Sequence, residues 1–422
     1  MRIQIITAGT TGSVAPYTGL GHRLRDEGHD VEIVTHAKFA DVVTCCGLRM
    51  RPLGADPFEE LLGAHERLRA PGRSPGAALE FVRATRRAAV ALADGLLSAV
   101  DPKADLLLLS SLVAPLGRVV AQYHGLPSMG AFLQPDTPTA AFSPCTTPWQ
   151  PPGQANRLRG HAANAVLDAL YGAANRALHA RLGLAFRSGH RLRSDRERSR
   201  WPIWHGYSPV VLPRPADWRP GLRVAGYWWP HECPDWEPPA LVTDFLAAGP
   251  PPVLVGFGSM MPGGPERLAG ITARALRKAG LRGVVQSGWA GLSVVNDDVI
   301  TVGALPHGWL MPRMAAVVHH AGAGTTAAGL RAAVPSVPVP VMTDQPWWAA
   351  RLVRLGVSPG VLPLSGLNAD RLAEALRRVT GDPRYTLRAA ELAARVGLED
   401  GAGAVARGIA EAGAGARLGV RP

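Results

Sequence analysis

The sequence predicts an α/β protein with two parallel-sheet domains, on three observations. With 422 residues, the chain is longer than one hydrophobic core usually serves. Short apolar runs alternate with longer amphipathic segments through both halves, as strands alternate with helices. Between the halves, residues 202–239 concentrate prolines and tryptophans. Because prolines break helices, this stretch indicates a linker.

The first half opens as a strand, a helix and a second strand. Apolar runs predict strands at residues 2–7, 30–35, 104–109 and 127–133. Amphipathic segments predict helices at residues 16–27 and 116–123, each between two of those strands. This succession favours a doubly wound parallel sheet.

The same pattern restarts after the linker. Strands are expected at residues 253–257, 282–286, 299–302, 316–319 and 337–340, and helices at residues such as 265–279 and 327–333. A second sheet of similar size is therefore predicted. Because open parallel sheets bind ligands at the carboxyl ends of their strands, two such domains predict a cleft that takes two substrates.

Charge and composition argue against a nucleic-acid partner. The formal net charge is +12, but only Lys38, Lys103 and Lys278 of the 45 basic residues are lysines, and the arginines are scattered. Their densest cluster, residues 187–200, contains acidic residues and no interleaved aromatic side chains. A positive field instead favours an anionic small substrate such as a nucleotide.

Hydropathy and cysteine content predict a cytoplasmic protein. The sequence shows no run of about 18 apolar residues and no secretion leader, so neither stable membrane insertion nor secretion is expected. Its four cysteines, Cys45, Cys46, Cys145 and Cys233, show no metal-ligand spacing. We therefore expect a reducing compartment.

The most informative segment is residues 319–326, between an apolar strand and an Ala-rich helix that we expect to start near Thr326. Such a turn presents backbone N–H groups and the positive end of a helix dipole, which suits a phosphate group. Gly322 and Gly324 allow close approach of the backbone, and Thr325 adds a hydroxyl donor. The alternative is a tight turn with capping threonines.

Two pairs of polar residues lie at predicted strand ends. In the first pair, His319 and His320, one histidine can hydrogen-bond or charge-pair with a phosphate oxygen. A metal site is not expected, because adjacent residues at a strand end point to opposite faces of the sheet. Asp344 and Gln345 offer the acceptors and the donor that sugar hydroxyls need. The alternative for the second pair is a helix N-cap by Asp344.

Together these segments resemble the donor-binding signature of the family 1 nucleotide-sugar glycosyltransferases. The match is closest to the bacterial branch that includes sterol glucosyltransferase-like and antibiotic glycosyltransferases. The resemblance is carried by residues 319–335, 344–346, 349–357, 255–260, 287–289 and 305–307, and on the acceptor side by residues 9–16, 207–209 and 224–228. It covers nearly the whole chain and is most specific between residues 252 and 357.

The resemblance implies a GT-B fold, which consists of two facing Rossmann-like domains with a cleft between them. It implies an N-terminal acceptor-binding domain at residues 1–205, a linker at 206–240, a donor-binding domain at 241–399, and a C-terminal helix at 400–422 that returns to the first domain.

The resemblance also implies roles for individual residues. The nucleotide-sugar co-substrate would be bound by Gly258, Ser259, Trp289, Leu305, His320, Gly322, Gly324, Thr325, Asp344 and Gln345. Of these, residues 320–325 with Ser259 would hold the diphosphate, residues 344 and 345 the sugar, and Trp289 with the backbone of Leu305 the nucleobase. No metal cofactor is implied, because fixed dipoles and the histidine would neutralise the leaving UDP or TDP.

The usual catalytic base is missing from its position. In this branch an Asp follows the loop glycine, whereas this chain has Ser13, whose hydroxyl is too weak a base at neutral pH. Asp136, just after a predicted strand, is the best substitute, although it also fits an ordinary turn. Three explanations stay open: another group serves as base, the acceptor ionises easily, or the protein does not catalyse.

The leading prediction is an inverting, metal-independent hexosyltransferase. It would move a sugar from a UDP- or TDP-sugar to a lipophilic or aromatic natural-product acceptor, as in antibiotic biosynthesis. The alternative is a non-catalytic homologue that binds nucleotide sugar or a partner transferase. A dinucleotide oxidoreductase is disfavoured, because Gly9 and Gly12 do not form the GxGxxG pattern.

Residues 56–78 and 132–152 are expected to be the acceptor wall or ordinary surface loops.

Overall fold

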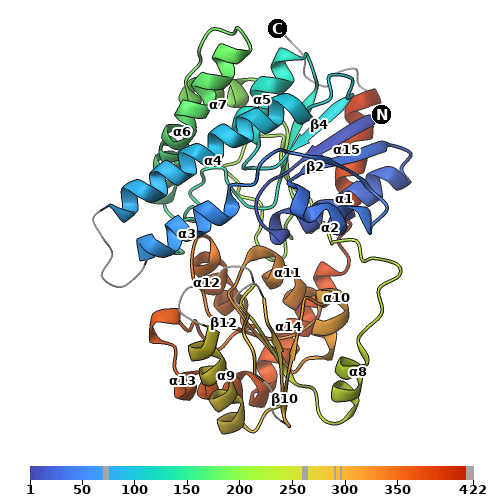
Figure 1. The fold of residues 1–422 in the computed structure, drawn as a ribbon, viewed down its shortest axis with the longest axis vertical. Coiled ribbons are helices and arrows are strands. Elements are labelled where there is room, and N and C mark those ends of the chain that lie inside the picture. The colour runs from blue at the N-terminus through green and yellow to red at the C-terminus, as the bar shows by residue number, and fades with distance from the viewer. Residues whose placement is uncertain (70–75, 259–264, 289–290, 295–296, 415–422) are drawn as a thin grey trace. The chain divides into compact units, whose positions relative to one another are not determined.

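The computed structural model describes residues 1–69, 76–258, 265–288, 291–294 and 297–414 (Figure 1). The chain divides into two compact units. Unit 1 holds residues 1–144, 151–234 and the segment that begins at Asp400. Unit 2 holds residues 145–150 and 235–399.

Unit 1 is built on a seven-stranded parallel sheet with the order β3-β2-β1-β4-β5-β6-β7. Its strands are β1 (Arg2–Ile6), β2 (Asp30–Thr35), β3 (Arg49–Pro52), β4 (Leu106–Leu109), β5 (Ser128–Phe132), β6 (Ile203–His205) and β7 (Leu222–Val224). The strand order reverses between β1 and β4, so the predicted doubly wound sheet is confirmed.

The helices of unit 1 flank this sheet. They are α1 (Thr11–Asp26), α2 (Ala40–Thr44), α3 (Phe58–Arg69), α4 (Ala77–Ala99), α5 (Ala114–Tyr123), α6 (Gln154–Arg181) and α7 (Gly189–Arg198), with a 3-10 turn at Ala37–Phe39. The predicted start of the first helix at Pro16 is wrong, because α1 begins at Thr11 and runs through this proline. Proline removes one backbone donor there, but burial of Tyr17, Leu20 and Leu24 in the core holds the helix together.

Unit 2 is built on a five-stranded parallel sheet with the order β10-β9-β8-β11-β12. Its strands are β8 (Val253–Gly256), β9 (Gly283–Gln286), β10 (Val299–Val302), β11 (Ala316–His319) and β12 (Ser336–Pro338). Its helices are α8 (Ala240–Ala247), α9 (Pro265–Ala279), α10 (His307–Leu310), α11 (Ala323–Arg331), α12 (Gln345–Leu355), α13 (Ala369–Gly381) and α14 (Pro383–Val396), with 3-10 turns at Met311–Arg313 and Leu364–Gly366. The predicted second sheet is confirmed.

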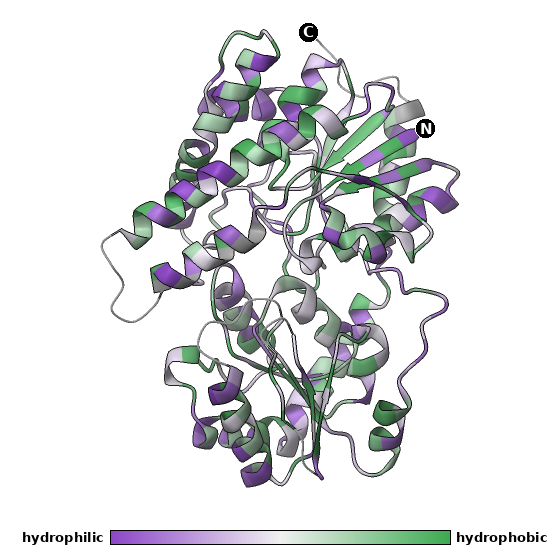
Figure 2. Cartoon of the chain, in the orientation of Figure 1, coloured by the Kyte–Doolittle hydropathy of each residue, from purple (hydrophilic) through white to green (hydrophobic). Residues whose placement is uncertain are grey.

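The two sheets provide the apolar centre of each unit. Figure 2 shows the strands mostly in green, the hydrophobic colour, while the outer helices carry both colours along their length. In unit 2, valines of β8, β9 and β11 are fully buried and pack with apolar residues of α9 and α13. This alternation of buried strands and two-faced helices is what the sequence pattern predicts.

The C-terminal helix α15 (Gly401–Ala414) packs on α1 and closes the core of unit 1. Val405, Ala406 and Ile409 are buried together with side chains of β1 and α1. In Figure 1 this red helix lies beside the blue N-terminal elements. The predicted return of the last helix to the first domain is confirmed.

The stretch expected to be a linker, residues 206–240, contains more structure than a linker needs. Strand β7 (Leu222–Val224) lies within it, and its residues up to Pro234 group with unit 1. Trp228 is buried against Tyr17 of α1, with their ring centroids 5.6 Å apart. Trp228, one of the tryptophans that indicated a linker, therefore belongs to the core of unit 1.

Two further findings concern the cysteines and the membrane. Cys45 and Cys233 form a disulfide across 188 residues of sequence, a pairing that local spacing does not predict. Among the described residues, no helix combines the length and the apolar character needed to cross a bilayer.

Candidate functional site

The carboxyl edge of the sheet in unit 2 gathers most of the predicted donor-site residues. Gly258 follows β8, and His320 and Gly322 follow the neighbouring strand β11. A Cβ atom on Gly258 would lie 2.8 Å from the His320 ring, and one on Gly322 would lie 2.5 Å from His320 Nε2. The imidazole therefore sits between two glycines that leave no room for a side chain, and this packing fixes its position.

Helix α11 begins at this edge, directly after the histidine. Its N-cap residue is Gly322, so the predicted start near Thr326 is wrong, and Gly324 and Thr325 lie in the first helical turn. The sequence places the start too late because glycine is a poor helix former in the interior but fits at an N-cap. No side chain caps this end, and first-turn N–H groups have no partner within a helix. These donors can therefore bind an anion.

The histidines of this edge are neutral at pH 7. Burial, and next the neighbouring His307, lower the pKa of His320 to about 4. Burial is also the largest cause that lowers the pKa of His319, to about 3. His319 Nδ1 accepts a hydrogen bond from the Ala321 backbone at 3.1 Å, whereas His320 Nδ1 is buried with no partner among the described residues. His320 can therefore offer a phosphate a hydrogen bond rather than a charge.

Asp344 and Gln345 lie where β12 leads into α12. Asp344 occupies the N-cap position of α12, but its side chain makes no capping hydrogen bond; its Oδ1 accepts from Thr343 Oγ1 at 2.9 Å. Gln345 is 1% exposed, and its Oε1 accepts from the backbone N–H groups of Val341 and Met342 at 2.8 and 3.0 Å. Gln345 Nε2 is buried without a partner in the described part of the chain. The pair thus combines a carboxylate with an unused amide donor.

Both turns carry a residue in a strained backbone conformation. Ala321, before α11, has φ +63°, and Thr343, before α12, has φ +53°. Residues other than glycine rarely adopt this left-handed region, and such strain is concentrated at ligand sites. The strained backbone at Ala321 and Thr343 is consistent with a ligand site at both turns.

The remaining predicted donor-site residues are only partly placed. Ser259 and Trp289 lie outside the described residues. Leu305 follows β10, is half-buried, and packs against the core that contains Val302 and Leu310. Among the described residues, the group of side chains that could hold a metal ion is in unit 1 and includes none of the donor-site residues.

In unit 1, Ser13 and Asp136 are both linked to Tyr17. Ser13 lies on α1 four residues before Tyr17, on the same helix face, and its backbone oxygen accepts from Thr7 Oγ1 at 2.8 Å. Asp136 is exposed in the loop after β5. Burial, and next the charge of Asp136, raise the pKa of the Tyr17 hydroxyl. The carboxylate of Asp136 therefore lies near the face of α1 that carries Tyr17 and, one turn earlier, Ser13.

Comparison with known proteins identifies the family. Residues 3–143 match the glycosyltransferase family 28 N-terminal domain, and residues 285–409 match the erythromycin biosynthesis protein CIII-like C-terminal domain. The chain is 32% identical over 424 residues to O-mycaminosyltylonolide 6-deoxyallosyltransferase of Streptomyces fradiae, and the match covers 95% of each chain. The chain belongs to the family 1 nucleotide-sugar glycosyltransferases. The predicted family is confirmed.

Other members of this glycosyltransferase family are also similar over nearly the whole chain. The sterol 3-beta-glucosyltransferase UGT80A2 of Arabidopsis thaliana is 34% identical over 427 residues. That match covers 96% of this chain but only 64% of the plant protein, which is therefore considerably longer.

Solved structures of glycosyltransferases share the fold. The glycotransferase of kitacinnamycin superposes with a TM-score of 0.69 at 19% identity, covering 97% of this chain and 98% of the other. The Streptomyces enzyme SsfS6 complexed with thymidine diphosphate gives 0.63 at 21% identity, covering 97% and 99%. The fold of this family 1 glycosyltransferase chain is GT-B, as predicted.

A polar group at the carboxyl edge of the sheet in unit 1 of this family 1 chain was not predicted from the sequence. Thr35 Oγ1, His36 Nδ1 and Ser110 Oγ are buried without partners among the described residues. His36 Nε2 lies 3.9 Å from Asp56 Oδ1, and burial lowers the pKa of His36 although Asp56 opposes the shift. The signal that could have found them is a polar residue directly after an apolar strand, since such residues face the ligand edge.

Part of the predicted acceptor wall packs inside unit 2. Within residues 145–150, the ring of Trp149 lies 4.5 Å from that of Trp347 on α12. Arg351 and Arg354 of the same helix lie over the Trp149 ring at 5.6 and 5.4 Å. This segment therefore packs on the helix that begins with Gln345, and it is more than an ordinary surface loop.

Replacing Gln345 with Ala is expected to destabilise unit 2 by about 2 kcal/mol or more. The change leaves the N–H groups of Val341 and Met342 unpaired in the interior, and each such group costs about 1–3 kcal/mol. Urea unfolding measures the loss. Asp344→Asn is the matched control, since it keeps the oxygen that Thr343 binds and should leave stability nearly unchanged. Equal stability of Gln345→Ala and the parent would contradict the assigned hydrogen bonds.

Proposed function

We propose that this protein is an inverting, metal-independent glycosyltransferase. It transfers a sugar from a UDP- or TDP-sugar to a lipophilic or aromatic hydroxyl acceptor, in the class of sterols and antibiotic aglycones. The observation that carries the proposal is the donor edge of unit 2, where His320 sits between Gly258 and Gly322 at the open N-terminus of α11. The relatives named above support the acceptor class, since they are a sterol and an antibiotic glycosyltransferase.

On the donor side, the site stabilises the leaving diphosphate. The first-turn N–H groups of α11, the hydroxyl of Thr325 in that turn and the ring N–H of His320 are donors at the same edge of the sheet, and we propose that they bind the diphosphate together. As the glycosidic bond to the diphosphate breaks, negative charge grows on the phosphate oxygens, and donors that are already oriented stabilise this charge. No step in this scheme calls for a cation.

On the acceptor side, a base must take the hydroxyl proton as the oxygen attacks the anomeric carbon. Asp136 is the proposed base, because its carboxylate is exposed and lies near the α1 face that carries Ser13 and Tyr17. His36 is the second candidate, because its neutral ring is paired with Asp56 at the neighbouring strand end. The alternative function, a homologue that binds nucleotide sugar or a partner transferase without catalysis, follows if neither group acts.

UDP or TDP is expected to bind this protein in the presence of EDTA. His320→Ala should weaken that binding about 2- to 13-fold, which corresponds to one neutral hydrogen bond of about 0.5–1.5 kcal/mol. The loss is modest because the pKa of about 4 leaves the imidazole uncharged at pH 7. Isothermal titration calorimetry measures both quantities. Binding that requires a divalent cation would overturn the metal-independent site.

Asp344→Asn is expected to raise the KM for the sugar donor while leaving the affinity for bare UDP or TDP nearly intact. The carboxylate of Asp344 does not cap α12, and because a carboxylate accepts several hydrogen bonds at once, we propose that it also accepts from sugar hydroxyls. Steady-state kinetics with the sugar donor, beside calorimetry with the bare nucleotide, separates the two effects. Equal losses for both ligands would show that Asp344 maintains the turn and does not read the sugar.

A further inference from the structure

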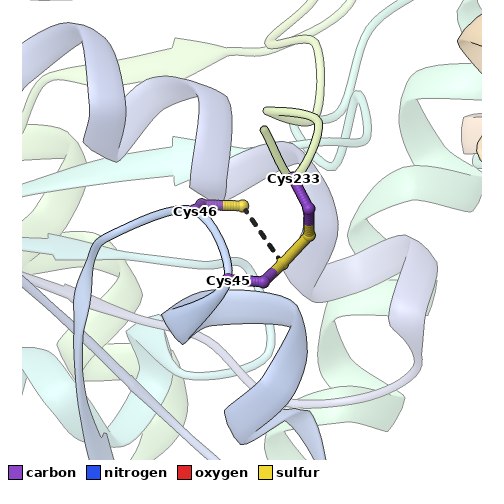
Figure 3. A group of neighbouring side chains, drawn as sticks. All are labelled: Cys45, Cys46 and Cys233. Atoms are coloured by element: carbon purple, nitrogen blue, oxygen red, sulfur yellow. Dashed lines mark hydrogen bonds between the residues drawn. A yellow bond between two sulfur atoms is a disulfide. The ribbon is translucent and has the colours of Figure 1, made fainter. Parts of the chain in front are cut away.

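A cluster of three cysteines, none of which has a role in the proposed catalysis, lies in unit 1. Cys45 and Cys46 follow helix α2, and Cys233 lies just before Asp235, where unit 2 resumes. Figure 3 shows the three side chains gathered in one place. Cys45 and Cys233 are joined by the disulfide, and Cys46 Sγ lies 3.9 Å from Cys45 Sγ. All three sulfur atoms lie within 4.8 Å of one another. The third thiol is therefore held against the disulfide.

The segment that carries Cys233 is firmly docked on α1. The backbone N–H of His231 donates to Thr18 Oγ1 at 3.0 Å, and a Cβ atom on Gly19 would lie only 1.7 Å from the backbone oxygen of Trp229. Cys46 Sγ also donates to the backbone oxygen of His231 at 3.3 Å. Because these contacts do not depend on the disulfide, they keep Cys233 next to the other two cysteines when that bond is open.

We propose that the reduced protein binds one thiophilic divalent cation, such as Zn²⁺ or Cd²⁺, on the sulfur atoms of Cys45, Cys46 and Cys233. Tetrahedral zinc with Zn–S bonds of about 2.3 Å places its sulfur ligands about 3.8 Å apart. The distance of 3.9 Å between the sulfurs of Cys45 and Cys46 fits that geometry. Cys45 is exposed, so the fourth position is open to water.

Formation of the metal site takes two steps, reduction of the disulfide and binding of the cation. A phosphine reductant supplies two electrons to the Cys45–Cys233 bond and takes the oxygen of one water molecule, whose two protons convert the two sulfurs to thiols. The cation then displaces three protons from the three thiols into solvent, since a coordinating thiol is deprotonated by the metal. Burial raises the pKa of the Cys46 thiol, while a hydrogen bond with Thr18 and the charge of Arg25 act in the opposite direction.

Titration of the phosphine-reduced protein with Cd²⁺ under anaerobic conditions tests the proposal. The ultraviolet thiolate-to-cadmium absorption band should rise to saturation at one ion per chain and should stay absent in the oxidised protein. Cys46→Ser should weaken Cd²⁺ binding at least about tenfold. Loss of a residue that only hydrogen-bonds to a metal ligand already costs about tenfold or more, and loss of a ligand itself should cost no less. This variant keeps the Cys45–Cys233 pair, so its oxidised form should fold normally.

Cys145→Ser is the matched control, because Cys145 is the other buried cysteine outside the disulfide and groups with unit 2. Its Cd²⁺ band should equal that of the parent. The absence of a saturable band in the reduced parent would overturn the proposal. Equal Cd²⁺ affinity in Cys46→Ser and the parent would also overturn the proposal, because it would show that Cys46 is not a ligand.

Discussion

Replacing Asp136 with Asn is expected to lower kcat by about 10²–10⁴-fold, the usual contribution of a general base. The amide keeps the shape of the side chain but cannot accept the acceptor's proton. Because Asp136 is exposed in a loop of unit 1, the change should leave folding and the affinity for UDP or TDP intact. The measurement is a pH–rate profile of the parent and the variant, with calorimetry to check donor binding.

Variants at two other positions separate the competing explanations. Ser13→Ala should matter little if Asp136 is the base, whereas His36→Asn should cause the large loss if the ring paired with Asp56 takes the proton. If the acceptor ionises unaided, all three variants should be mild, and the rate should follow the acidity of a series of phenols. A Ser13→Asp variant that gains rate would show that the site lacks only its usual base. No product from Ser13→Asp with any bound acceptor would favour the non-catalytic homologue.

The fold could be predicted from sequence because its signals are local. The apolar runs of both sheets are short and bounded, and the strand at residues 30–35 matches β2 (Asp30–Thr35) at both ends. The turn from β11 into α11 was predictable for the same reason, since Gly322, Gly324 and Thr325 follow a strand within a few residues. The bounds of α1 and α11 were less predictable, because Pro16 and Gly324 are both poor helix formers. Core packing keeps Pro16 inside α1, and the N-cap at Gly322 places Gly324 in the first turn of α11.

What sequence did not predict depends on contacts between distant residues. The imidazole of His320 is held by Gly258, which lies on another strand end, and its neutrality comes from burial that no local pattern reports. Likewise, the bonds from Gln345 to the preceding turn show that a residue predicted to bind sugar also supports the backbone. The pairing of Cys45 with Cys233 spans 188 residues. Such features follow from tertiary packing alone.

Acid is expected to unfold this protein because several histidines are buried in the neutral form. Burial is the largest cause that lowers the pKa of His205 and His319 to about 3 and that of His320 to about 4, from an ordinary value of 6.5. Below pH 6.5 the unfolded chain takes up protons on these residues while the folded chain does not. Stability therefore falls as the pH decreases from 6.5 towards 4, by about 1.4 kcal/mol per pH unit for each histidine.

Three such histidines together remove about 4 kcal/mol of stability per pH unit, against a total of about 5–15 kcal/mol for a typical domain. The free energy of unfolding, measured in urea between pH 7 and 4, should show this slope. The double variant His205→Asn and His319→Asn should reduce the slope about threefold, because one titrating histidine of the three remains. Asparagine does not titrate, but its side-chain amide can make the hydrogen bonds that the two Nδ1 atoms make with the backbones of Arg223 and Ala321. The slope is the quantity to compare, since the substitutions also change stability at pH 7. An unchanged slope in the double variant would show that carboxylates, and not these buried histidines, cause the acid sensitivity.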